Sequence, residues 1–106
     1  MFSLKSKIKI QISKKRFISN SDKCFIVAEI SGNHVGNLKL LKRTMLSAKK
    51  AGADAVKIQS YEAESLTLNS KNKHFLINDK SIWRGKNLYD LYKKAQTPFK
   101  WHKEIF

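Results

Sequence analysis

The segment from Phe25 to Gln59 constrains the fold of this chain more than any other part of the sequence. It consists of a nearly continuous apolar stretch, a polar loop, an amphipathic stretch, a glycine and a second apolar stretch, and its length of about 35 residues suits a β–α–β unit. Strands that are apolar on both sides are typical of a parallel sheet covered on both faces. The sequence therefore predicts two parallel strands, Phe25–Ile30 and Ala55–Gln59, joined by a right-handed helical crossover.

Residues with known positional preferences mark the ends of the predicted helices. Asn37 suits the N-cap of the helix that follows it, and Gly52 suits the residue that stops that helix. Farther on, a short helix is predicted over Asn87–Ala95, while Thr97 and Pro98 predict the N-cap and first turn of another. The apolar side of the first helix is formed by Leu38, Leu41, Met45, Leu46 and Ala48.

The first part of the chain has a different pattern. Lys7–Ile12 alternates polar and apolar residues, which predicts a strand with one solvent-exposed face. The basic stretch Ser13–Arg16 predicts a turn, and Phe17 predicts the start of a return strand. We therefore interpret residues 1–23 as a β-hairpin with a polar connector, and residues 24–106 as a second domain.

Polar residues near the ends of the two apolar strands are the strongest indication of function. Because side chains alternate along a strand, Glu29 on the first strand and Lys57 with Gln59 on the second fall on one face, opposite apolar residues. In a closed β/α barrel this set would point into the lumen, since the helix layer is apolar, and active sites of such barrels lie at the carboxyl ends of the strands. The sequence therefore predicts a site that contains these three residues. The alternative is an ion pair that only fills the barrel interior.

Other candidate residues have weaker support. His34 lies in the loop after the first strand, where a lone histidine is more often a turn or surface residue than a ligand, and no second histidine follows at a metal-ligand spacing. Trp83, together with Arg84 and Gly85, is interpreted either as a substrate-facing loop or as an aromatic lid on the barrel rim. The single cysteine, Cys24, excludes an internal disulfide and a cysteine-based zinc site.

The net charge of +14 arises from 22 basic residues against 8 acidic ones. Nearly all of the basic residues are lysines spread along the chain, whereas nucleic-acid surfaces favour clustered arginines. We therefore expect solvated lysine-rich faces and no nucleic-acid site, with a lysine-rich non-catalytic binding module as the alternative. No apolar run approaches the length of a membrane span and no signal peptide is evident, so we expect a cytoplasmic protein without a membrane partner.

Four motifs give this chain a specific resemblance to a known family. They are AEISGNHVGNL, KKAGADAVKIQSY, the Leu66–Leu68 segment and IWRGKNLYDLYKKAQTPFKWHKEIF. Together they resemble the N-terminal part of the sialic acid synthase family of phosphoenolpyruvate-condensing enzymes, from about Phe25 to Phe106. The long final motif favours the pseudaminic branch of this family over the neuraminic and legionaminic branches, which remain the alternatives.

The resemblance implies a (β/α)8 barrel followed by an antifreeze-like domain in a domain-swapped homodimer. It also implies the condensation of phosphoenolpyruvate with an amino sugar, 2,4-diacetamido-2,4,6-trideoxy-L-altrose in the pseudaminic branch, assisted by a divalent manganese or magnesium ion. By match of motif, Lys57 would meet phosphoenolpyruvate, Glu29 would hydrogen-bond the sugar, and Gln59 would lie beside both. Asn33 and His34 would shape the loop after the first strand, and Trp83 would face the substrate.

Chain length limits these expectations. A barrel of this type needs about 250 residues, whereas the chain has 106. We therefore expect an α/β chain that contains the opening β/α units of a TIM-type barrel and ends before the third strand. The metal ligands and the C-terminal domain of the family would lie outside it, and we expect it to be inactive by itself.

Overall fold

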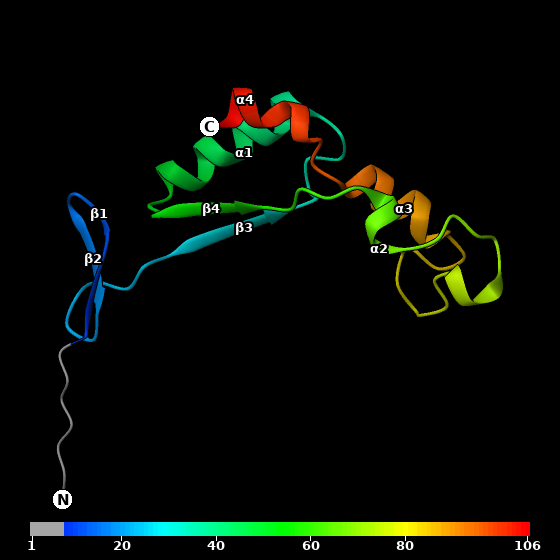
Figure 1. Cartoon of the computed structure of the whole chain (residues 1–106), viewed down its shortest axis with the longest axis horizontal. Coiled ribbons are helices and arrows are strands. Elements are labelled where there is room, and N and C mark those ends of the chain that lie inside the picture. The colour runs from blue at the N-terminus through cyan, green and yellow to red at the C-terminus, as the bar shows by residue number, and fades with distance from the viewer. Residues whose placement is uncertain (1–7) are drawn as a thin grey trace, which may run out of the picture.

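The structure, a computed structural model, describes residues 8–106 and contains two separate two-stranded sheets (Figure 1). The first sheet pairs two neighbouring strands, and the second belongs to a β–α–β unit that is followed by short helices. In chain order the elements are β1 (Lys9–Ser13), β2 (Arg16–Ser19), β3 (Val27–Ser31), α1 (Leu38–Lys50), β4 (Ala55–Ile58), α2 (Ala63–Leu66), η1 (Lys73–Phe75), α3 (Leu88–Ala95), η2 (Phe99–Trp101) and α4 (His102–Ile105).

The predicted hairpin is present in β1 and β2. The two strands are antiparallel, with Lys9 opposite Ser19, and the register is irregular between Gln11 and Ser13. Lys7, where the strand was predicted to begin, lies outside the described residues. A boundary between two domains at residue 23 stays a prediction.

The predicted β–α–β unit is also present. β3 and β4 pair in parallel, with Glu29 opposite Lys57, and α1 lies over one face of them (Figure 1). β3 begins later than predicted: the N–H of Ile26 donates to the Asp54 side chain at 2.9 Å, and the Ile26 carbonyl accepts the N–H of Asp54 at 2.8 Å and that of Ala55 at 3.2 Å. β4 ends earlier because the Gln59 carbonyl accepts the N–H of Thr97 at 3.0 Å.

Helix α1 has the predicted ends. The Asn37 side chain accepts the N–H of Leu40 at 3.0 Å, which caps the first turn. At the other end Gly52 has a φ of +95°, a conformation that glycine adopts without a steric cost. Leu41 is fully buried between α1 and the sheet, and Ile30 is nearly so.

Among the described residues the β3–β4 sheet is covered on one face only, and coverage of both faces in a complete barrel stays a prediction. Ala28 and Ile30 of β3 face the helix side and are partly or fully buried, whereas Val27 and Glu29 on the other face are exposed. Within residues 8–106, α1 supplies the covering layer on one side only, because the later helices pack elsewhere. The expected alternation of apolar and polar faces is nevertheless confirmed.

The helices after β4 follow the prediction in part. The helix predicted over Asn87–Ala95 is present as α3, and Asn87, which was predicted as its first residue, caps it by accepting the N–H of Tyr89 at 2.8 Å. Tyr89, which is buried, donates its hydroxyl to Glu64 and so joins α3 to α2. The predicted cap at Thr97 is wrong: Pro98 precedes the 3₁₀ turn η2, and the Thr97 hydroxyl bonds to a histidine instead.

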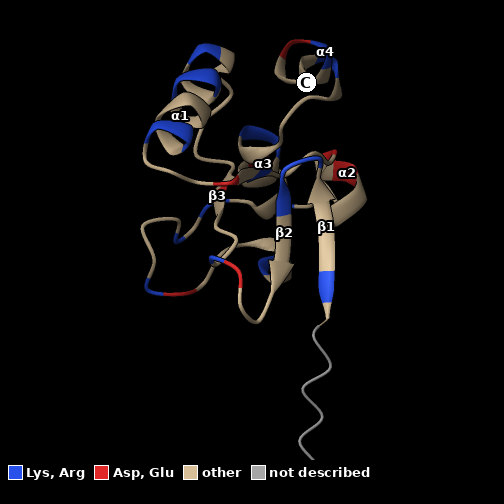
Figure 2. Ribbon diagram, turned by 90° about the vertical axis from the view of Figure 1, so that its left-hand side faces the viewer, with Lys and Arg blue, Asp and Glu red and all other residues tan. Residues whose placement is uncertain are grey.

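The described chain is open rather than compact. Its radius of gyration is 19.1 Å, compared with about 13 Å for a compact domain of this length. The buried apolar residues are few, namely Ile30, Leu41, Ala63 and Tyr89. The basic residues are dispersed over α1, α3 and the hairpin (Figure 2). Among the described residues, no helix has the length and apolar character needed to cross a membrane.

The fold is therefore of the α/β class, with one parallel β–α–β unit at its centre. Residues 8–106 contain two parallel strands, whereas a closed barrel of this type has eight. The barrel therefore stays a proposal.

Candidate active site at the carboxyl ends of β3 and β4

Glu29 and Lys57 form an ion pair across the two parallel strands. The Lys57 Nζ lies 2.8 Å from the Glu29 Oε2, and their side chains are 64% and 38% exposed. The sequence predicted the pairing but placed the charges in the interior of a covered sheet. In the structure both are exposed, because no element among residues 8–106 covers their face of the sheet.

Ser31 also holds the Glu29 carboxylate, and sequence analysis missed it. Its backbone N–H and its hydroxyl both donate to the Glu29 Oε1, at 2.9 and 3.1 Å. The hydrogen bond from Lys57 is the main cause that lowers the pKa of Glu29 below its ordinary value; desolvation opposes it, and the hydrogen bonds from Ser31 add to the lowering. Glu29 is therefore ionised at neutral pH, and three donors fix its orientation.

The backbone conformation around Ser31 explains how both of its donors reach the Glu29 carboxylate. The register of β3 with β4 shifts between Glu29 and Ser31, and the φ of Ser31 is +53°. A bulge of this kind turns a backbone N–H out of the ladder, here toward the Glu29 side chain. Val35 in the same loop has a φ of +50°, which is unusual for a β-branched residue. Strained residues cluster at functional sites, so the loop is a candidate for function.

His34 fixes the loop after β3 through contacts of its buried ring. Its ring is fully buried, and its Nε2 lies 2.9 Å from the hydroxyl of Thr97, which is also fully buried. The N–H of Gly36 donates to the His34 Nδ1 at 3.0 Å, so the neutral ring carries its proton on Nε2 and donates to Thr97. Trp101 packs edge-on against the ring at 5.2 Å. Burial lowers the pKa of His34, which favours this neutral form.

The segment Ala95–Thr97 ties α3 to the ends of both strands. A Cβ atom on Gly32 would lie 2.6 Å from the Ala95 carbonyl oxygen, so the loop after β3 can approach α3 only with a glycine at this position. The N–H of Thr97 bonds to the end of β4, and the Gln96 side chain accepts the N–H of Ala63 at 3.0 Å. These contacts give α3 a fixed place beside the strands.

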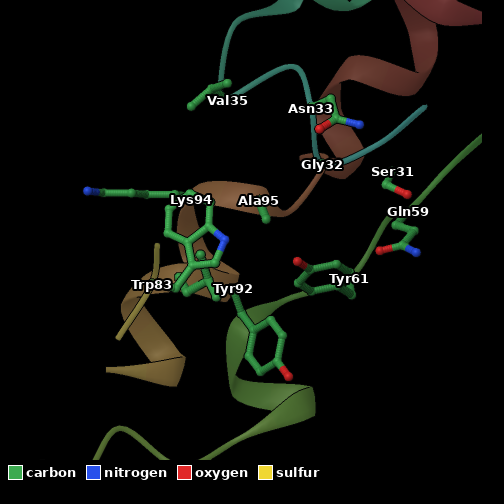
Figure 3. A pocket seen from close by; sticks show the side chains of 11 residues that line it. Ser31, Gly32, Asn33, Val35, Gln59, Tyr61, Trp83, Tyr92, Lys94 and Ala95 are labelled. Carbon is green, nitrogen blue, oxygen red and sulfur yellow. The ribbon is translucent and has the colours of Figure 1, made fainter. Parts of the chain in front are cut away.

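A pocket of about 500 Å³ lies between this loop and α3 (Figure 3). Three of the residues predicted for the site line it, namely Asn33, Gln59 and Trp83. Ser31, Tyr61 and Tyr92 also line it and were missed by the sequence analysis. The remaining predicted residues lie outside its lining: Glu29 and Lys57 form the neighbouring ion pair, and His34 is buried in the loop.

The divalent metal implied by the resemblance has no ligand set in the described part of the chain. Among residues 8–106, no group of three or more histidine, cysteine, aspartate or glutamate side chains is arranged to hold a metal ion. The site residues therefore do not fit a metal centre, and we assign no chemical step to a metal here.

Comparison with known proteins relates this region to a group of enzymes. Residues 44–106 match the sequence model of the NeuB family. A pseudaminic acid synthase of Campylobacter jejuni subsp. jejuni serotype O:2 is 50% identical over 88 residues, which are 82% of this chain and 25% of that protein. A pseudaminic acid synthase of Helicobacter pylori is 48% identical over 81 residues, which are 76% of this chain and 24% of that protein.

A more distant relative widens the comparison. The N-acetylneuraminate-9-phosphate synthase of Mus musculus is 37% identical over 100 residues, which are 85% of this chain and 27% of that protein. The chain thus spans about a quarter of the length of the curated relatives that it matches.

Proposed function

Because this chain belongs to the NeuB family, we propose that it supplies the first β–α–β unit of an active site that condenses phosphoenolpyruvate with an amino sugar. One water would be consumed, and the products would be a nine-carbon 2-keto acid and phosphate. Higher identity to two pseudaminic acid synthases than to the N-acetylneuraminate-9-phosphate synthase supports pseudaminic acid as the product. The homodimer and the cytoplasmic location expected from the sequence stay predictions.

The ion pair at the carboxyl ends of β3 and β4 is the observation that carries this proposal. Phosphoenolpyruvate carries a phosphate and a carboxylate, and a lysine ammonium is a compact charge with three donors. One donor of Lys57 meets Glu29 in the structure. We propose that the other two donors bind the anionic substrate. The ammonium would then stabilise the negative charge that develops on the departing phosphate.

Glu29 has a complementary role in the proposal. Each oxygen of an ionised carboxylate accepts more than one hydrogen bond. Oε1 already accepts two hydrogen bonds from Ser31, whereas Oε2 accepts one from Lys57, so Oε2 can also accept from a sugar hydroxyl. Glu29 would thereby orient the sugar next to the phosphoenolpyruvate that Lys57 holds, which brings the two reactants together.

A graft tests this proposal. The matching segment of the Campylobacter jejuni relative is replaced by that of this chain, and phosphate release from phosphoenolpyruvate and the trideoxy diacetamido sugar is measured. We expect Lys57→Met in the graft to lower kcat/KM for phosphoenolpyruvate by at least about tenfold. Lys50→Met, at the exposed end of α1, is the matched control and should leave kcat/KM unchanged.

Two results would overturn the proposal. If Lys57→Met and Lys50→Met gave the same kinetics in an active graft, Lys57 would not meet the substrate. Equal turnover of N-acetylmannosamine and the trideoxy diacetamido sugar by the graft would leave the family reaction in place and exclude the pseudaminic assignment.

A further inference from the structure

We propose that the pocket between the loop after β3 and α3 is a subsite for the acylamino groups of a neutral sugar, with Tyr61, Trp83 and Tyr92 as its aromatic wall. This inference rests on the proposed function, since it assigns one part of the sugar substrate to a specific set of residues. It concerns residues outside the Glu29–Lys57 pair, and therefore it can fail or succeed independently of the role of that pair.

The wall is built from aromatic residues of different segments. Tyr61 follows β4, Tyr92 belongs to α3, and their rings meet edge to face at 6.2 Å and 90°. Trp83 comes from the loop before α3, is 40% exposed, and has the Lys86 Nζ 4.7 Å from its ring centroid. Figure 3 shows Trp83 and Tyr61 on opposite sides of the space below Gly32. Aromatic faces of this kind suit methyl groups and the apolar faces of sugar rings.

Uncharged polar groups also line the pocket. Asn33 donates its side-chain N–H to the Ile30 carbonyl at 2.9 Å, which holds the amide in place while its Oδ1 can accept from a ligand. Gln59 adds an exposed amide and Ser31 a hydroxyl. A side-chain amide both donates and accepts, as an acetamido group does, so the two can pair with each other.

The lining of the pocket is almost uncharged, and the Lys86 ammonium, which is outside the lining, lies 4.7 Å from the Trp83 ring centroid. Among the described residues that line it, Lys94 carries the single charge, and Figure 3 shows its ammonium directed away from the aromatic wall. Burial raises the pKa of Tyr61, so its hydroxyl stays neutral and remains a donor. An anionic ligand such as phosphoenolpyruvate therefore finds its counter-charge at Lys57, and an amide-bearing sugar finds its partners in the pocket.

The pocket is continuous with the ion pair and is held open by the fold. Ser31 lines the pocket and also donates to Glu29, so a sugar that reaches Glu29 with one hydroxyl can place a substituent against the wall. The contact of Gly32 with Ala95 and the bond of Thr97 to Gln59 fix α3 at the pocket's edge. A volume of about 500 Å³ is within the usual range for small-molecule sites.

The test titrates the full 106-residue chain, labelled with nitrogen-15, with neutral sugars while amide shifts are followed by NMR. The probes are a diacetamido trideoxy hexose, N-acetylmannosamine and mannose, which carry two, one and no acetamido groups. We expect saturable shifts at Ser31–Asn33, Tyr61 and Tyr92–Ala95, and an affinity that decreases in the order of the probes. Equal binding of mannose, or the absence of saturable shifts at these amides, would overturn the inference.

Variants sharpen the test. Trp83→Ala should weaken binding of the diacetamido probe by about three- to tenfold, whereas Phe106→Ala, which removes an exposed ring outside the pocket, should not change it. If Trp83→Ala disturbs the amide signals of Gly32 and Thr97, Tyr92→Leu takes its place. Unchanged affinity in the variant that keeps the fold would contradict the assignment.

The result is separable from that of the graft. Pocket binding together with normal kinetics of Lys57→Met would leave the subsite standing and remove the proposed role of Lys57. A kinetic defect of Lys57→Met without sugar binding in the pocket would have the opposite meaning.

Discussion

The two ends of the β3–β4 sheet use charged residues in opposite ways. At the amino end, Arg16 holds both oxygens of Asp54 at 3.2 Å and donates to the carbonyls of Lys23 and Cys24 at 3.0 Å. Asp54 in turn accepts the N–H of Ile26. At the carboxyl end, Glu29 pairs with Lys57 and accepts from Ser31, and the side chains of Glu29 and Lys57 are exposed to solvent.

This difference distinguishes a structural contact at the amino end from a candidate binding site at the carboxyl end. The N–H donors of Arg16, on the hairpin, bond to backbone carbonyls and to the carboxylate of Asp54 beside the sheet. A bidentate arginine–carboxylate pair of this kind fixes the relative orientation of its two side chains. The ammonium of Lys57 and the oxygens of Glu29 keep unused bonding capacity next to a strained loop and a pocket. A ligand can therefore compete for the charges at the carboxyl end far more easily than for those at the amino end.

The largest expected effect comes from filling the space at Gly32. In Gly32→Ala the new Cβ would meet the Ala95 carbonyl oxygen at 2.6 Å and the Ala95 Cβ at 2.7 Å, so α3 must move away from the loop. We expect a loss of about 3 kcal/mol in the free energy of unfolding, at the upper end for overpacking, measured by urea titration of tryptophan fluorescence. The control is Gly85→Ala, where no atom lies within 4 Å of the added Cβ and only the φ of +77° adds strain. Equal losses in both variants would show that α3 does not depend on this contact.

Removal of the hydroxyl that meets His34 should have the next largest effect. Thr97→Val keeps the shape of the side chain but leaves the buried Nε2–H of His34 without its acceptor. An unsatisfied buried donor costs about 2 kcal/mol, and we expect the loop amides Ser31–Val35 to exchange faster with solvent. Thr97→Ser, which retains the hydroxyl, should recover most of the loss. A Thr97→Ser variant as unstable as Thr97→Val would point to the methyl group instead.

The buried histidine also predicts a dependence on pH. Burial lowers the pKa of His34 below its ordinary value of about 6.5, so the unfolded chain binds a proton before the folded chain does. Stability is then fully present above about pH 6.5 and decreases as the pH falls toward the folded-state pKa, by at most about 1.4 kcal/mol per pH unit. Glu29 and Asp54, whose pKa values are lowered, lose their contribution only in a more acidic range. Urea titrations at several pH values should show the first decrease in the native chain and not in His34→Gln.

The smallest effect on global stability is expected at the amino end. Asp54→Asn weakens the pair with Arg16 but keeps an acceptor for Ile26, so the sheet should persist while the hairpin gains freedom. We expect larger amplitude motion for residues 9–19 in nitrogen-15 relaxation, with unchanged amide signals at Ser31 and Thr97. A change at the carboxyl end that equals the change in the hairpin would show that the two ends are coupled.

Much of the β–α–β unit could be predicted from local sequence. The apolar runs, the cap at Asn37 and the stop at Gly52 all appear in the structure because each depends on neighbouring residues only. The pairing of Glu29 with Lys57 followed from side-chain alternation combined with parallel strands. The resemblance to a synthase family was likewise carried by residues in sequence and is confirmed by the NeuB match.

The rest depended on contacts between distant parts of the chain. Thr97 has the sequence signature of a cap, but His34, 63 positions away, takes its hydroxyl. Ser31 reaches Glu29 only because a bulge turns its N–H aside, and Tyr61 meets Tyr92 only because Ala95–Thr97 docks on both strand ends. The periodicity of a sequence predicts only which residues lie on the same face of one helix or one strand. Tertiary packing decided which group accepts the buried proton of His34, which way the loop after β3 turns, and which residues line the pocket. Each of these features requires atoms from elements that are far apart in the sequence.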